Sequence, residues 1–139
     1  MTNVIMFIDI KFDDNFILEK LKYIIYDIDG NLIKKYDDNH INYISDDLDI
    51  VDTIIGYNID YCIIEFYRLN NNIITDKINN KRHICLREMG KNFLNYVSYP
   101  SLSNIYKFIF GKYNNDIDEL TMCKECYFEI IYNNCMKKR

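Results

Sequence analysis

The chain of 139 residues has the length of one domain, and its composition, 49% hydrophobic and 15% aromatic, supplies a core and excludes a disordered polymer. Its net charge of −4 gives no overall basic character for binding nucleic acid. We therefore expect a single domain over residues 1–139. The many Ile, Asn, Lys and Tyr residues have AT-rich codons, which indicates an AT-rich genome such as that of a virus or a parasite.

Three β-strands are predicted at the start of the chain. Residues 4–10 form a short apolar run of strand-favouring side chains, which is typical of a buried strand. Residues 21–28 form a second such run. The sequence Asp29-Gly30-Asn31 is a strong turn signal, because Gly tolerates positive φ, and residues 32–36 then pair back as a third strand.

Helices and strands alternate in the rest of the chain. The polar stretch 70–82 is predicted to be a loop. Pro100 is placed in the first turn of a helix that Gly111 ends. The other expected elements are helices beginning at Ser45 and ending by 54, at 60–69, from 87 to about 97 and at 116–136, and strands at 54–57 and 83–86.

This order of elements predicts an α/β fold, with a mixed central sheet of about five strands flanked by helices. The four glycines do not form G-x-G-x-x-G or a Walker loop, so a doubly wound nucleotide-binding fold is disfavoured.

The five cysteines are an odd number, and we expect free thiols in a reducing compartment. Cys123 and Cys126 form C-x-x-C, but they share helical spacing with Leu120 and Tyr127. Burial in a core explains this pattern better than zinc, because a structural zinc site needs a second pair of ligands.

The segments FIDIK (7–11), IIGYNIDYCIIEF (54–66) and NNDIDE (114–119) together resemble the motifs of the DnaQ-like (DEDD) 3′→5′ exonucleases of the RNase H-like superfamily. FIDIK, at 7–11, is similar to the first motif, an apolar strand ending in Asp-x-Glu. IIGYNIDYCIIEF, at 54–66, is similar to the second, Gly-His-Asn-x-x-Phe-Asp and an apolar helix. NNDIDE, at 114–119, is similar to the third, His-x-Ala-x-Asp-Asp. The resemblance spans almost the whole chain and implies the RNase H-like fold.

In this family four carboxylates hold two divalent ions that activate water, and a histidine acts as general base. Asp9 matches the first acid, and Glu119 replaces the fourth conservatively. Lys11 stands at the second acid and reverses its charge, Cys62 stands at the third, and Asn114 stands at the histidine. A neutral thiol is a poor ligand for Mg²⁺.

The resemblance with these replacements implies a pseudoenzyme that needs no cofactor and acts by binding a protein partner or nucleic acid. We favour a protein partner or a homo-oligomer, because an acidic chain gains little affinity from counterion release. No residue is assigned to nucleic-acid binding. The alternative is an active exonuclease on DNA or RNA that uses Mg²⁺ or Mn²⁺ at Asp9 and Glu119.

Charge counting adds an expectation about the degenerate site. The ammonium of Lys11 should lie within reach of Asp9 or Glu119 and balance them in place of a metal, unless its side chain extends into solvent. No apolar run is long enough for a signal peptide or a membrane span. We therefore expect no membrane association and an intracellular protein, in the cytoplasm or nucleus, or in the host cytoplasm if the source is a virus.

Overall fold

The computed structural model describes residues 3–37 and 43–137, with side chains up to residue 132. These residues form one sheet in the order β3-β2-β1-β4-β5. β2 is antiparallel to its neighbours β1 and β3, while β4 is parallel to β1 and β5 to β4. The strands are β1 Val4–Phe12, β2 Leu18–Asp27, β3 Leu32–Asp37, β4 Thr53–Gly56 and β5 Arg82–Cys85. The predicted mixed sheet of five strands flanked by helices is confirmed.

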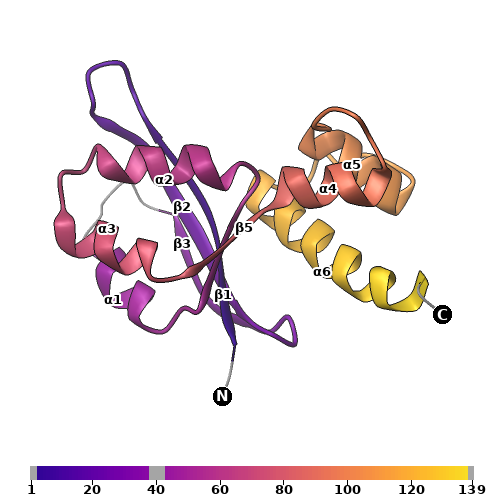
Figure 1. Cartoon of the computed structure of the whole chain (residues 1–139), viewed down its shortest axis with the longest axis horizontal. Helices are drawn as coiled ribbons and strands as arrows, with labels where there is room; N and C mark the ends of the chain where they lie inside the picture. The colour runs from indigo at the N-terminus through magenta and orange to yellow at the C-terminus, as the bar shows by residue number, and fades with distance from the viewer. Residues whose placement is uncertain (1–2, 38–42, 138–139) are drawn as a thin grey trace.

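The sheet is the middle of three layers (Figure 1). One face is covered by α1 Ile44–Asp49, α2 Ile59–Tyr67 and α3 Asn72–Asn79. The other face is covered by α4 Leu86–Leu94, α5 Leu102–Phe110 and α6 Glu119–Lys137. Because both faces are covered, the central strand β1 is apolar on both sides, which explains its continuous apolar run.

Alternation along β1 decides which side chains meet which helices. Met6 and Ile8 point into the core under α1–α3, while Ile5 and Phe7 point into the core under α4–α6. Asp9 continues the second set, on the same face as α6, and it is the first residue of that set to leave the fully buried core. β1 thus places the carboxylate of Asp9 at the edge of an apolar core.

The predicted loop at 70–82 is wrong, because it contains α3. Ile74 and Ile78 are four residues apart and buried, and the side chain of Asn71 accepts a hydrogen bond from the amide of Ile74 and caps the helix. The high Asn content of this stretch makes it polar on average, although its apolar residues have the spacing of a short amphipathic helix. The tertiary core selects the helix, since a peptide of this length would not form one alone.

Several predicted ends shift for local reasons. The helix predicted to run to 54 ends at Asp49, because Ile54 belongs to the buried strand β4. Ser101, not Pro100, caps α5 by accepting from the amide of Asn104, and Gly111 ends that helix at φ +78, as predicted. The last helix begins at Glu119 instead of 116.

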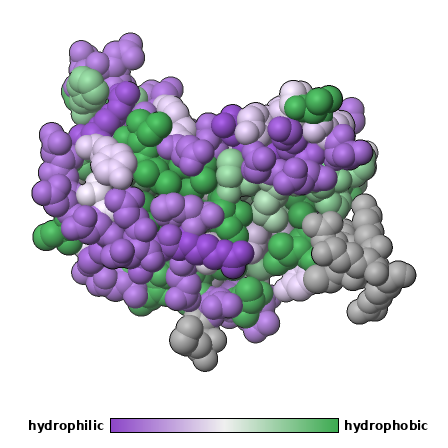
Figure 2. Space-filling view, in the orientation of Figure 1, coloured by the Kyte–Doolittle hydropathy of each residue, from purple (hydrophilic) through white to green (hydrophobic). Residues whose placement is uncertain are grey.

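The surface is mixed in polarity. Figure 2 shows hydrophilic side chains over much of the visible face, with hydrophobic ones scattered between them. In the part of the chain that the structure describes, no helix combines the length and the apolar character needed to cross a membrane.

Candidate functional site

A cavity of about 370 Å³ lies where β1, α2, α5 and α6 meet. It brings together Asp9, Cys62 and Glu119, three positions that are far apart in the sequence. The full lining is Ile8, Asp9, Tyr57, Asn58, Tyr61, Cys62, Ser101, Leu102, Ser103, Glu119, Leu120 and Cys123. The three segments that resemble exonuclease motifs therefore converge on one hollow.

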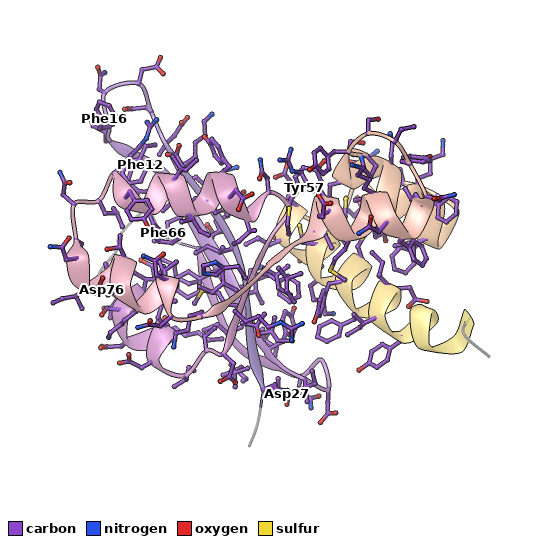
Figure 3. All side chains as sticks on the ribbon, viewed as in Figure 1. Phe12, Phe16, Asp27, Tyr57, Phe66 and Asp76 are labelled. Atoms are coloured by element: carbon purple, nitrogen blue, oxygen red, sulfur yellow. The ribbon has the colours of Figure 1, made fainter. Side chains whose placement is uncertain are left out.

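The first turns of α2, α5 and α6 all contribute to this cavity. Asn58 caps α2 by accepting from the amide of Tyr61, at 3.5 Å. Tyr57 lies between the α2 half of the molecule and the α4–α5 half (Figure 3), and its hydroxyl donates a hydrogen bond to the carbonyl of Pro100. That contact fixes the start of α5 against the chain leaving β4.

Asp9 forms an ion pair with Lys20 of β2, whose ammonium lies 3.2 Å from Oδ2 of Asp9. A second hollow, of about 270 Å³, has both residues in its wall together with Lys22, Asp118 and Glu119. Burial by itself lowers the pKa of Lys20, but the charge and hydrogen bond of Asp9 and the charge of Glu119 raise it more, so the net pKa lies above 10.5. The cation at this site is therefore firmly protonated.

The expectation that Lys11 approaches Asp9 or Glu119 is wrong. Its ammonium lies 3.6 Å from Oε2 of Glu19, and more than half of its side chain is exposed. Lys11 is opposite Lys20 in the β1–β2 register, so the two ammonium groups repel each other and extend in different directions. Lys20 takes the position beside Asp9.

Cys62 lies in the first half of α2 and is 6% exposed. Burial, together with the negative charge of Asp9, raises the pKa of the Cys62 thiol to about 12. The thiol is neutral at physiological pH, as expected. Neither its charge nor its softness suits Mg²⁺.

Asn114 does not line the cavity. Its Oδ1 accepts from the amide of Asp116, at 2.9 Å, and it also hydrogen-bonds Tyr106. The side chain that stands at the family's general base therefore shapes the loop before α6. Asp118 caps that helix by accepting from the amide of Thr121, at 2.8 Å, which leaves Glu119 to face the cavity.

Cys123 and Cys126 are buried in the core between the sheet and α6, as expected for a helical face. The expectation of free thiols is confirmed for Cys62, Cys85, Cys123 and Cys126, while the side chain of Cys135 lies outside the described residues. Among the residues that the structure describes, no three His, Cys, Asp or Glu side chains are grouped to hold a metal ion. Asp9 and Glu119 are the two carboxylates of the cavity, and Asp9 is already paired.

Sequence reasoning missed Lys20 and the first turn of α5 as parts of the site, and it did not single out Tyr57 and Tyr61 within the segment similar to the second motif. Lys20 could be found only from the strand register, because nothing local marks it. Asn58 lies within the segment similar to the second motif, so that signal was present.

No family model matches the chain, and no curated protein or solved structure gives a match.

Proposed function

We propose that the chain is a DnaQ-like exonuclease domain with the RNase H-like fold, in which an internal ion pair has replaced the metals and hydrolysis is lost. Two observations support the family. The three similar segments meet at one cavity, and the mixed five-stranded sheet agrees with the fold that the resemblance implies. The domain then acts by binding a partner.

The observation that carries the loss of hydrolysis is the contact between Lys20 and Asp9. Two carboxylates, one ammonium and a neutral thiol leave a net charge near −1, where two dications need four carboxylates. Mg²⁺ gives up its hydration shell only for several oxygen ligands in octahedral geometry. An ammonium beside Asp9 competes with such an ion for the same oxygen.

The direct test is an exonuclease assay on end-labelled single-stranded DNA and RNA with Mg²⁺ and then Mn²⁺. We expect no shortening of either strand and no heat of Mn²⁺ binding in calorimetry below about millimolar concentrations. Metal-dependent shortening that Asp9→Asn abolishes would contradict the proposal.

A constructive test rebuilds the site. Lys11→Glu and Cys62→Asp restore carboxylates at the second and third acid positions of the family, and Lys20→Gln removes the competing ammonium. We expect this variant to bind Mn²⁺. The matched control carries Cys62→Asn in place of Cys62→Asp and keeps the shape without the charge. Equal Mn²⁺ binding by both variants, or by neither, would count against the assigned positions.

A second candidate is an active exonuclease that uses Mg²⁺ or Mn²⁺ at a reorganised site. It is favoured by one observation, that Asp9 and Glu119 line the same cavity. In that case a metal displaces Lys20 from Asp9, and Lys20→Gln increases the metal-dependent rate. Under the main proposal Lys20→Gln alone produces no activity, because Cys62 remains neutral.

A further inference from the structure

The balance of acidic and basic residues changes along the chain. The first 80 residues carry 15 acidic and seven basic residues, whereas residues 81–113 carry six basic residues and one acidic residue, Glu88. That second stretch forms β5, α4 and α5. The last two lie on the opposite side of the sheet from α1–α3 (Figure 1).

The two sets of basic side chains differ in their partners. All seven in the first 80 residues form ion pairs, at 2.9 to 3.9 Å. None of the six in residues 81–113 forms an ion pair with a side chain that the structure describes. At physiological salt, charges more than about 8 Å apart are largely screened, so the charges nearest to this stretch have the largest effect. The net charge of the whole chain therefore does not decide which partner binds here.

Aromatic rings are exposed among these charges. The ring of Tyr99 lies 4.1 Å from the guanidinium carbon of Arg87 and 4.9 Å from the ammonium of Lys91, both on α4. The Tyr99 hydroxyl hydrogen-bonds Glu88, so three contacts with side chains of α4 hold an exposed ring in place. Nε of Arg87 is buried without a hydrogen-bond partner.

A separate shallow hollow of about 390 Å³ lies on α5. It is lined by Tyr96, Asn104, Lys107, Phe108 and Gly111. Asn104 lies in the same helical turn as Ser101, which lines the candidate site, so the two hollows share the start of α5. We call Arg87, Lys91, Tyr96, Tyr99, Lys107 and Phe108 the α4–α5 surface.

We propose that the α4–α5 surface binds single-stranded nucleic acid, with phosphates on Arg87, Lys91 and Lys107 and bases stacked on Tyr99 and Phe108. Unpaired basic side chains attract the phosphate backbone of the nucleic acid. Exposed rings stack on bases, which are accessible in a single strand but not in a duplex. An acidic peptide satisfies the charges, whereas a nucleic acid also supplies a ring for stacking with every nucleotide. This inference does not rest on the proposed loss of hydrolysis, because its residues lie outside the candidate site.

The test is the anisotropy of fluorescent oligo-dT and oligo-U, measured in EDTA so that no metal-dependent step contributes. We expect the logarithm of the association constant to fall linearly with the logarithm of the salt concentration. The slope should be about −0.7 for each phosphate contact. Lys91→Glu with Lys107→Glu should weaken binding at least about tenfold at low salt. The control, Lys35→Glu with Lys77→Glu, changes net charge equally on side chains elsewhere and should leave affinity within about twofold.

The rings distinguish nucleic acid from any polyanion. Tyr99→Ala or Phe108→Ala should weaken oligonucleotide binding roughly tenfold while Tyr99→Phe keeps it, and heparin binding should not respond to either ring. Circular dichroism melting checks that each variant folds. Three results would each overturn the proposal. They are no oligonucleotide binding at about 50 mM salt, an equal loss of affinity in the control variant, and an affinity that neither ring substitution changes. The last result would indicate an acidic protein partner instead.

Discussion

The ammonium of Lys20 on β2 lies 3.2 Å from Oδ2 of Asp9 on β1, although the two residues are not opposite each other. Asp9 faces Lys22 in the register, and Lys20 faces Lys11. Diagonal neighbours in an antiparallel pair are about 7–8 Å apart at Cα, a distance that a long side chain such as lysine spans. The contact therefore depends on the register of the two strands.

Lys20→Gln should lower the free energy of unfolding by less than about 1 kcal/mol at neutral pH, because both partners are partly exposed. The pKa of Lys20 is raised in the folded protein, so its contribution is complete below the ordinary value of 10.5 and is lost as pH rises through the folded-state pKa. Urea unfolding of both proteins at neutral pH and above that pKa checks this. A difference that persists at high pH would contradict it.

The buried thiols should make the protein sensitive to alkali. Burial raises the pKa of Cys62 and Cys126 to about 12 and raises that of Cys123 above 9.0. The unfolded chain ionises first, so stability is full below about pH 9 and falls toward pH 12, by up to about 1.4 kcal/mol per pH unit for each thiol. Urea unfolding across this range measures the slope, and Cys126→Ala should reduce it. Iodoacetamide at about pH 8 should leave all three thiols unmodified until urea is added.

The buried carboxylate of Asp47 should anchor α1 to the sheet. It accepts a hydrogen bond from the Tyr23 hydroxyl and pairs with Lys34, at 2.9 Å. Asp47→Ala should cost about 3 kcal/mol, because it leaves these two groups without their acceptor. Tyr23→Phe should cost about 1 kcal/mol. Asp46→Ala, on the exposed side of α1, is the control and should change stability by no more than about 0.5 kcal/mol in urea unfolding.

Glu65 should hold the β1–β2 hairpin against α2. It is 2% exposed, and its Oε2 accepts from the amide of Phe12 at 3.1 Å. Glu65→Ala leaves that buried amide unpaired and should cost about 2–3 kcal/mol and loosen the turn at 13–17. Hydrogen exchange at Phe12 and limited proteolysis of the turn measure this. Asp60→Ala, exposed on the same helix, should leave both unchanged.

Gly90 should be required for the packing of α4 on α5. A Cβ there would lie 2.4 Å from Cδ1 of Ile105. Gly90→Ala should therefore destabilise by about 1–3 kcal/mol, although Ala ordinarily favours a helix by up to about 1 kcal/mol. Thermal melting checks the sign, and Ile105→Val in the same background should recover part of the loss. A Gly90→Ala protein more stable than the parent would show that α5 shifts freely.

The sequence by itself determined the first three strands and the residue types at the site. Apolar runs and a Gly-containing turn predict β1, β2 and β3, because strand burial and turn geometry are local properties. Motif similarity selected Asp9, Cys62 and Glu119, and the structure places all three in one cavity.

Only the tertiary structure decided which groups act together. Strand register brings Lys20, not Lys11, to Asp9, because a contact across strands depends on pairing that is invisible in either strand alone. α3 forms because Ile74 and Ile78 find a core, which overrides a polar composition. Folding also pairs the basic residues of the first half with nearby acids, whereas those of α4 and α5 form no ion pair among the described residues; Glu88 is the one acid in their stretch of chain.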